Sequence, residues 1–401
     1  MRLRTFDSFW LLRDGTPHSY PSLHNRNEAC QIVVVGGGIS GALISHALME
    51  ENYNVILIDK RDIATGSTAA STSMLQYEID KPLYKLAEKI GEEAAVECYK
   101  AGVNAIYDLG KLTLELKLDC GFEAKQSLFV ACKEKHAEWL EREFEIRKKH
   151  GFEVQWLKPE DVKRDYGINC FGAILSNAGG GIDGYKFTHE LIAYNAKRGM
   201  KVFDQTAIEK IDYEGKGVTI HTESGCTIDC EKIIFCTGYE ATEMLKEKVA
   251  YVFYTYACIS EKEIVIPEKL KNTLVWDTAW RYTYMRYIDD GRLLIGGEDA
   301  AGFFPFLQNW IKKIKAKKLQ KRLKDMMPGV EFIMDYSWGG KFGITGDGLP
   351  YIGKSPEFEK ALFVLAYGGN GIVFSVQAMQ IIIDLLKGKE NSLSRHYRFG
   401  R

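Results

Sequence analysis

The chain has 401 residues, enough for two or three domain-sized units with a sizeable core. Its 46% hydrophobic and 27% charged residues are ordinary for a globular enzyme, and a net charge of −1 gives no argument for nucleic-acid binding. No apolar run approaches the length of a membrane-spanning helix and the N-terminus lacks a signal-peptide core, so we expect a cytoplasmic protein.

An irregular lead-in over residues 1–29 comes first, and its aromatic residues Phe9 and Trp10 are expected to anchor it to the body. Residues 32–41 then read Ile-Val-Val-Val-Gly-Gly-Gly-Ile-Ser-Gly, an apolar strand that runs into a glycine turn. A helix follows to about residue 52, and a second apolar strand ends at Asp59. This strand–turn–helix–strand order is typical of a fold that binds a dinucleotide.

Each residue type in this unit has a physical reason. Gly36 lets the chain turn tightly, Gly38 lets the backbone approach a pyrophosphate, and Gly41 lets the helix pack on the sheet. The positive N-terminal end of the helix faces the phosphates, and Asp59 can accept hydrogen bonds from ribose hydroxyls. A dinucleotide implies redox chemistry, whereas the alternative is a glycine-rich turn in an ordinary α/β fold.

The next part of the chain alternates between helical and irregular segments. Residues 62–76 are small and hydroxyl-rich, which lets the backbone come near a bulky ligand. Apolar spacing predicts helices over 82–116, 134–150 and 186–198. A glycine-rich stretch over 171–184 precedes the last of them.

Strands dominate the middle of the chain. Alternating patterns predict short strands over 201–203, 207–211 and 218–222. An apolar run over 233–236 indicates a buried strand that is stopped by a glycine. Strands and turns alternate over 249–298, which is typical of an antiparallel sheet.

Residues 307–327 are the most basic segment. Lysines and arginines surround apolar positions such as Trp310, Leu319 and Leu323 in the pattern of an amphipathic helix. A solvated helix face is one interpretation of this pattern. The other is a docking surface for an electron-acceptor partner or for another anionic surface.

A second strand–glycine–helix unit lies near the C-terminus. Residues 362–366 are apolar, residues 367–371 read Tyr-Gly-Gly-Asn-Gly, and residues 372–387 carry a helical apolar stripe. The two units stand at opposite ends of the chain, so we expect two interleaved domains.

Nine cysteines are an odd number, and they show neither a C-x-x-C pair nor a metal-like cluster with histidine. We therefore expect no metal site. Cys226 and Cys230 are the nearest pair, and the residues around them suggest a hairpin. Free buried thiols are the main expectation, and a redox pair at these two positions is the alternative.

Four segments together resemble the flavin-dependent amine and amino-acid oxidoreductases, the superfamily of D-amino-acid oxidase, glycine oxidase and monomeric sarcosine oxidase. They are 35–41, 66–72, 234–238, and 338–353 with 368–371. The resemblance implies FAD rather than NAD. It also implies an α/β fold, with a Rossmann-like FAD-binding domain and an interleaved α+β substrate domain on a large, mainly antiparallel sheet. We assign the FAD-binding domain to 1–80, 165–248 and 330–401, and the substrate domain to 81–164 and 249–329.

The resemblance also implies which residues contact FAD. A reduced flavin carries negative charge at its N1–C2 edge, which suits the amides and positive dipole end of the helix that starts near Gly371. The expected contacts are Gly36, Gly38, Ile39, Ser40, Gly41, Asp59, Lys60, Gly66, Ser67, Thr68, Ala207, Thr237, Gly238, Gly343, Gly368, Gly369, Asn370, Gly371 and Ile372. Some members of this superfamily attach the flavin covalently through a cysteine or a histidine in these segments. Since 337–353 hold no cysteine and 60–80 hold no histidine, the resemblance implies non-covalent FAD.

Members of this superfamily oxidise a C–N bond by hydride transfer to flavin N5, and they need a cation for the substrate carboxylate. Arg286 resembles that cation, and a strand over 281–287 would place Trp280, Tyr282, Tyr284 and Arg286 on one face. The alternative is a half-exposed sheet in which Arg286 is a surface arginine and the tyrosines only pack. Tyr256 and Lys341 are further candidates, and packing or solvation accounts for them equally well.

The function predicted from the sequence is therefore FAD-dependent oxidation of a small amino acid or secondary amine. One alternative is a flavin dehydrogenase of a 2-hydroxy acid or of glycerol phosphate. Another is a subunit that holds FAD without turnover.

Overall fold

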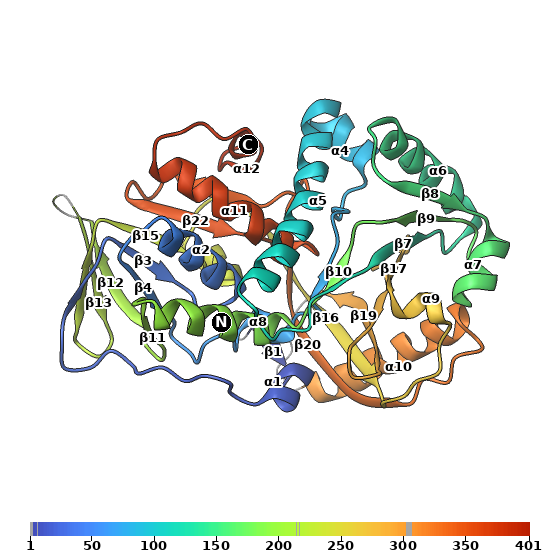
Figure 1. The fold of residues 1–401 in the computed structure, drawn as a ribbon, viewed down its shortest axis with the longest axis horizontal. Coiled ribbons are helices and arrows are strands. Elements are labelled where there is room, and N and C mark those ends of the chain that lie inside the picture. Colours follow the sequence, from blue (N-terminus) through green and yellow to red (C-terminus); the bar gives the residue numbers. More distant parts are fainter. Residues whose placement is uncertain (1–2, 6, 214, 216, 302–306) are drawn as a thin grey trace.

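The computed structural model describes residues 3–5, 7–213, 215, 217–301 and 307–401. Two sheets organise the chain (Figure 1). In Figure 1 the six-stranded sheet with α2 and α11 lies on the left, the nine-stranded sheet with α7, α9 and α10 lies on the right, and α5 stands between them. The helices are α1 (Phe9–Asp14), α2 (Ile39–Glu50), α3 (Ser67–Ala70), α4 (Leu83–Ile90), α5 (Glu92–Glu115), α6 (Glu134–Lys149), α7 (Pro159–Tyr166), α8 (Gly184–Lys197), η1 (Gly238–Glu243), α9 (Glu268–Lys271), α10 (Gln308–Met326), α11 (Gly371–Leu386) and α12 (Ser394–Tyr397).

The six-stranded sheet is parallel except at its last strand. Its order is β11 (Lys201–Phe203), β4 (Val55–Ile58), β3 (Ile32–Val35), β15 (Lys232–Phe235), β22 (Ala361–Leu365) and β21 (Tyr351–Lys354). Both faces are covered, which is why these strands are continuous apolar runs. Val34 and Leu57 face α2, α8 and α11, whereas Val33 and Ile56 face a four-stranded sheet. That smaller sheet has the order β12 (Ile208–Asp212), β13 (Val218–Thr222), β14 (Thr227–Cys230) and β2 (Glu28–Ala29).

The nine-stranded sheet is antiparallel except for the pair β7–β17. Its order is β1 (Arg4–Thr5), β20 (Met334–Ile344), β16 (Tyr251–Ser260), β19 (Leu293–Ala300), β18 (Tyr284–Tyr287), β17 (Thr273–Asp277), β7 (Gln126–Val130), β9 (Ala173–Ser176) and β8 (Val154–Leu157). One face packs against Leu319 and Leu323 of α10, and the other face carries Ala257 and Trp338 into the central core. A third sheet joins β5 (Met74–Leu75), β10 (Gly180–Gly181) and β6 (Glu123–Ala124).

The strand pairing shows where the chain passes from one large sheet to the other. Strands β9 and β20 lie inside ranges that we assigned to the FAD-binding domain, yet they pair with β7 and β16 of the large sheet. The chain therefore crosses between the two sheets nearer to residue 180 and residue 345 than to 165 and 330. The helix predicted over 82–116 is two helices, because Gly91 adopts φ +93° and ends α4.

The strand predicted over 281–287 is wrong at its start. Strand β18 begins only at Tyr284, because Arg281 adopts φ +62° and turns the chain. Trp280 is 89% exposed, so it shares no buried face with Tyr284 and Arg286. Tyr282 instead extends from the loop, and its hydroxyl donates to the Asp80 carboxylate (3.1 Å).

The N-terminal lead-in is anchored by Phe9 and Trp10, as expected. Both side chains are buried, and Phe9 stacks on Trp338 with ring centroids 6.4 Å apart. Strand β1 adds an edge strand to β20, so the lead-in crosses the boundary between the two large sheets.

The buried His189 of α8 should make the stability of the fold fall at low pH. Its side chain is 1% exposed, and its ring nitrogens have no hydrogen-bond partner among the described residues. Burial lowers its pKa to about 4 from 6.5. Below pH 6.5 the unfolded chain takes up a proton that the folded chain refuses, so unfolding becomes easier by up to about 3 kcal/mol as pH falls to 4. Urea unfolding from pH 7 to 4.5 should lose less stability in His189→Gln than in the natural chain, and equal pH slopes would contradict this.

Candidate functional site

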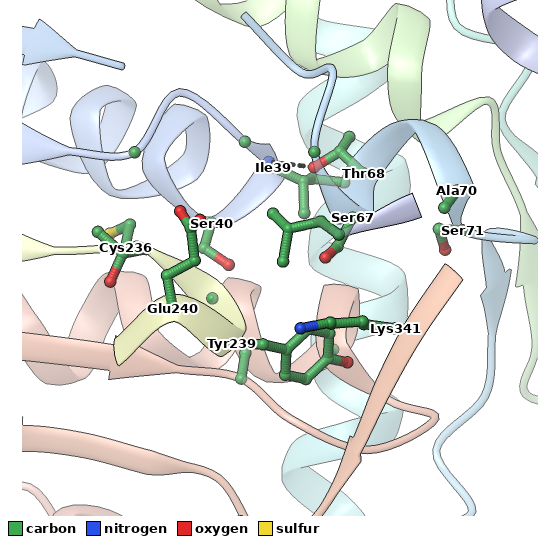
Figure 2. A pocket seen from close by; sticks show the side chains of 18 of the residues that line it. Ile39, Ser40, Ser67, Thr68, Ala70, Ser71, Cys236, Tyr239, Glu240 and Lys341 are labelled. Atoms are coloured by element: carbon green, nitrogen blue, oxygen red, sulfur yellow. Dashed lines mark hydrogen bonds between the residues drawn. The ribbon is translucent and has the colours of Figure 1, made fainter. Parts of the chain in front are cut away.

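One elongated cavity of about 590 Å³ runs between the two sheets. Residues from both strand–glycine–helix units line it, including Gly36 and Gly38 before α2 and Gly369 and Gly371 at α11. Figure 2 shows part of it, with Ile39 and Ser40 of α2 on one side and Tyr239 and Lys341 on the facing side. The two distant glycine turns therefore face a single space.

The first glycine turn admits no side chains. Gly36 adopts φ +109°, and a Cβ there would lie 2.5 Å from the Cys236 carbonyl oxygen. A Cβ on Gly41 would lie 1.8 Å from the Gly36 oxygen, so this residue serves close helix packing and does not itself line the cavity. No side chain caps the start of α2, and its Ile39 amide donates to Thr68 Oγ1 (3.0 Å), which Figure 2 marks with a dashed line. The N-terminal end of α2, where Gly38 offers no capping side chain, suits a pyrophosphate.

Polar groups surround the end of the cavity beyond β4. Asp59, Lys60 and Ala207 line it there, as the sequence predicts. The Asp59 carboxylate accepts hydrogen bonds from the Gly37 and Arg61 amides, both at 2.8 Å, and burial raises its pKa. Its position at the end of β4 suits an interaction with ribose hydroxyls.

The hydroxyl-rich segment after β4 forms one wall. Gly66, Ser67 and Thr68 line the cavity. Ser67 Oγ, Gln76 Nε2 and Thr237 Oγ1 are buried without a hydrogen-bond partner among the described residues, and all three belong to the lining. Buried polar atoms normally find partners, so these atoms indicate that a polar ligand fills the space.

The second glycine turn forms the opposite end. Gly368, Gly369 and Ile372 line the cavity beside the N-terminus of α11. Asn370 does not line it, and its amide nitrogen instead donates to the Gln76 and Glu78 carbonyls at 2.6 and 2.9 Å. The sequence predicts that Asn370 contacts FAD, whereas in the structure its side chain points to these two carbonyls and ties the start of α11 to the segment after β5.

Near the second glycine turn, some neighbouring residues line the cavity and others pack behind its wall. Gly238 lines the cavity, and its carbonyl accepts from the Tyr367 hydroxyl (2.9 Å). Gly343 lies outside the lining, where a Cβ would come within 2.5 Å of the Tyr239 ring. Its lack of a side chain therefore makes room for Tyr239, which does line the cavity.

The large sheet closes the cavity with hydroxyl and aromatic side chains. Thr255, Tyr282, Tyr284 and Lys341 line this part. Burial raises the pKa of Tyr284 to about 12 and lowers that of Lys341. The wall therefore offers neutral hydroxyl groups at physiological pH.

Tyr256 and Arg286 lie outside the lining. Tyr256 faces the opposite side of β16, where Lys315 of α10 lies over its ring at 6.0 Å. The expectation that it contacts substrate was made from strand alternation, and its neighbour Thr255 occupies that position instead. Arg286 is 3% exposed and donates from Nη2 to the Ile182 carbonyl (2.7 Å).

Several lining residues were not foreseen from the sequence. Leu3 comes from the lead-in, Thr255 from β16, Gln76 from the segment after β5, and Tyr282 from the loop before β18. Asp80 supports the site by accepting from Tyr282 and from the Gly369 amide (3.1 Å each). Tyr282 belonged to the aromatic run before Arg286 and Gln76 to the hydroxyl-rich segment 62–76, whereas Leu3 and Thr255 carried no motif.

The described residues contain neither a disulfide bond nor a metal-like cluster. All nine cysteines are free, and no metal-like group of three acidic, histidine or cysteine side chains occurs in the described part of the chain. No described helix has both the length and the apolar character needed to cross a bilayer.

Comparison with known proteins agrees with this geometry. A family model described as FAD dependent oxidoreductase matches residues 31–385. Glycine oxidase from Bacillus licheniformis is 25% identical over 388 residues, which cover 89% of this chain and 92% of that protein. Glycine oxidase from Geobacillus kaustophilus (strain HTA426) is 26% identical over 386 residues, which cover 91% and 97%.

A crystal structure of glycine oxidase from Geobacillus kaustophilus superposes with a TM-score of 0.78 at 22% identity, over 94% of this chain and 99% of that one. This likeness shows the shared fold. Together with the family match over most of the chain, and with a cavity that suits a dinucleotide, it means that the protein belongs to the FAD-dependent oxidoreductase family and is an enzyme with FAD as its cofactor.

Proposed function

We propose that the enzyme oxidises the C–N bond of a small amino acid or secondary amine. The observation that carries this proposal is the cavity that joins both glycine turns to the wall formed by Thr255, Tyr282 and Tyr284. The hydroxyl groups of this wall would contact the substrate beside the residues proposed to hold the flavin ring. The sequence relatives named glycine oxidase support the same substrate class.

Arg286 is the proposed partner of the substrate carboxylate. Its Nε has no hydrogen-bond partner, and no carboxylate among the described residues lies within ion-pair distance of the guanidinium. Burial lowers its pKa to about 10, so it stays charged at neutral pH. A buried cation without a paired anion favours binding of a carboxylate, which can accept two parallel hydrogen bonds. Tyr284 stands two residues earlier on the same strand and lines the cavity.

Bound FAD supplies the two-electron oxidant, and the chain supplies orientation and electrostatics. Tyr282 and Tyr284 form an aromatic wall against which a small substrate can pack. Lys341 lies across the cavity from the α2 turn, where its charge can act on either the cofactor or the substrate carboxylate.

Anaerobic titration of the purified holoenzyme tests the proposal. Glycine, sarcosine, D-amino acids and L-proline should bleach the flavin absorbance, whereas 2-hydroxy acids and glycerol 3-phosphate should not. Bleaching by the hydroxy compounds alone would replace the proposal with the dehydrogenase alternative. Intact flavin that no compound reduces would contradict it.

We also propose that FAD is held without a covalent bond. Residues 60–80 contain no histidine and residues 337–353 contain no cysteine. Acid precipitation of the purified protein should leave the yellow chromophore in the supernatant, as measured by its absorbance and mass. A yellow precipitate would overturn this prediction.

The exposed face of α10 is proposed to bind an anionic lipid surface. Lys313, Lys317, Lys321 and Lys324 recur once per helical turn and are exposed, and Trp310, also exposed, stands one turn earlier. Because α10 packs on the face of the sheet opposite the cavity, this surface favours attachment over direct electron transfer. Each lysine near anionic lipid contributes about 1 kcal/mol.

Reversing these four charges to glutamate should abolish sedimentation with vesicles that contain phosphatidylserine at low salt. Reversal of the exposed lysines at 111, 133, 135 and 148 is the matched control and should retain it. Binding to soluble acidic polypeptides but not to vesicles would replace the lipid with an acidic protein partner. Equal sedimentation of both variants would contradict the proposal.

A further inference from the structure

The N-terminal lead-in contributes directly to the proposed substrate site. The family match begins only at residue 31, so the lead-in lies outside the matched region. Nevertheless Leu3 lines the cavity, and the Lys341 amide donates to the Leu3 carbonyl (2.9 Å). Leu3 therefore brings a lead-in side chain into the cavity wall, directly before strand β1.

Trp10 joins two elements of this site. It is 1% exposed, and its indole nitrogen donates to the Ser71 carbonyl (2.7 Å). Ser71 belongs to the hydroxyl-rich wall of the cavity. On its other side, the Arg286 guanidinium lies over the indole, 5.5 Å from the ring centroid. One side chain thus contacts both the cavity wall and the proposed carboxylate partner.

Arg13 anchors the C-terminal end of α1 beside Arg286 through ion pairs. Its guanidinium lies 4.9 Å from the Trp10 ring centroid and forms ion pairs with Asp183 and with Asp289 (3.2 Å). Asp183 also caps α8 by accepting from the Lys186 amide (2.9 Å). These ion pairs connect α1 to the start of α8 and to the turn after β18, and so hold Trp10 in place beside Arg286.

Gly181 leaves room for the Arg286 guanidinium. A Cβ on Gly181 would lie 2.5 Å from Nη1, so a larger residue there would displace the guanidinium. The Ile182 carbonyl accepts from Nη2, and Nε has no hydrogen-bond partner among the described residues. The Trp10 indole lies against the same guanidinium, where a cation–π contact can hold its plane.

We propose that Trp10 is a positioning residue for carboxylate recognition, acting through Arg286 and the Ser71 wall. This inference rests on the proposed role of Arg286. An arginine can make two parallel bonds to a carboxylate only when its plane is aligned with the ligand. The indole face aligns that plane by cation–π contact, and the indole N–H holds the adjoining wall.

Trp338 provides a matched control. It is also 1% exposed, and its indole nitrogen donates to the Ala70 carbonyl (2.9 Å), one residue before Ser71. It packs on Phe9 and Tyr336 rather than on a guanidinium. Leucine at either position removes a buried indole and one hydrogen bond to the same segment, but only Trp10→Leu removes the surface under Arg286.

The test measures acetate binding to the FAD-loaded protein through the change in flavin absorbance, so it needs no turnover. Wild-type protein should bind acetate, and Arg286→Leu should lose that binding. Trp10→Leu should weaken the acetate Kd about tenfold, whereas Trp338→Leu should leave it within about threefold despite a comparable fall in unfolding midpoint. Trp10→Phe, which keeps a ring under the guanidinium, should recover most of the affinity.

Equal acetate affinity in Trp10→Leu and Trp338→Leu would overturn the inference, as would wild-type protein that does not bind acetate. If Trp10→Leu fails to retain FAD, Arg13→Gln replaces it and should weaken acetate binding in the same direction. Acetate binding that depends on Trp10 and Arg286 supports the inference even if no amine reduces the flavin, so the proposed function can fail separately.

Discussion

We expect the Arg286→Leu variant to raise the Michaelis constant for an amino-acid substrate about 100-fold, which corresponds to about 3 kcal/mol, while FAD content stays unchanged. The reason is that a buried guanidinium without a carboxylate partner contributes to the site through the ligand it binds. Leucine fills similar apolar space, and the Ile182 carbonyl then loses its bond from Arg286, so the unfolding midpoint of the variant is measured beside its kinetics. Steady-state kinetics, combined with the ratio of flavin to protein absorbance, measure both quantities.

Arg281→Leu is the matched control for this experiment. Arg281 is exposed in the loop before β18, and its backbone carbonyl accepts from Arg322 Nη1 (2.8 Å). Its replacement should leave the Michaelis constant within about twofold, as is usual for a surface substitution. A similar rise in both variants would point to a general effect of charge, and an unchanged value in Arg286→Leu would remove Arg286 from the site.

A second large effect is expected at the first glycine turn. In Gly36→Ala, fewer than about one in ten molecules should retain FAD, because the new Cβ would meet the Cys236 oxygen at 2.5 Å and the position requires φ +109°. Either the turn shifts toward the pyrophosphate or the junction of β3 and β15 opens. The measurement is the flavin content of protein purified in the presence of excess FAD, together with its thermal unfolding midpoint.

Gly199→Ala is the control that tests whether backbone strain alone, without a steric clash, causes the loss of FAD. Gly199 adopts φ +104°, nearly the same conformation, but a Cβ there would have no neighbour within 4 Å. We expect it to lose some stability and keep its FAD. If Gly199→Ala loses FAD to the same extent as Gly36→Ala, then strain alone explains the effect and the close approach at Gly36 is unimportant.

Much of the cofactor site could be predicted because its signals are local. A strand that ends in Gly36, a helix that begins at Ile39 and an acid at Asp59 are each encoded within a few residues. The structure places all of them on one cavity with Gly368 and Gly371. Their contacts with FAD itself stay predictions.

The substrate wall was harder to predict. Strand alternation assigned Trp280, Tyr282, Tyr284 and Arg286 to one face, but the positive φ of Arg281 ends that regularity. The same reasoning favoured Tyr256, whereas its neighbour Thr255 reaches the cavity and Tyr256 packs under α10. Alternation tells which residues share a face, and it does not tell which face of a two-sided buried sheet meets a ligand.

The amino-acid sequence by itself indicated a dinucleotide and the two strand–glycine–helix units, because tight turns and helix starts depend on short-range sterics, while the resemblance to a known superfamily implied FAD. Only the tertiary structure decided that the lead-in packs beside the cavity, that Asn370 ties α11 to the segment after β5, and that Arg286 lies under Trp10. These contacts join residues that are distant in the chain. They depend on how two sheets and their connecting loops pack together, which no local pattern encodes.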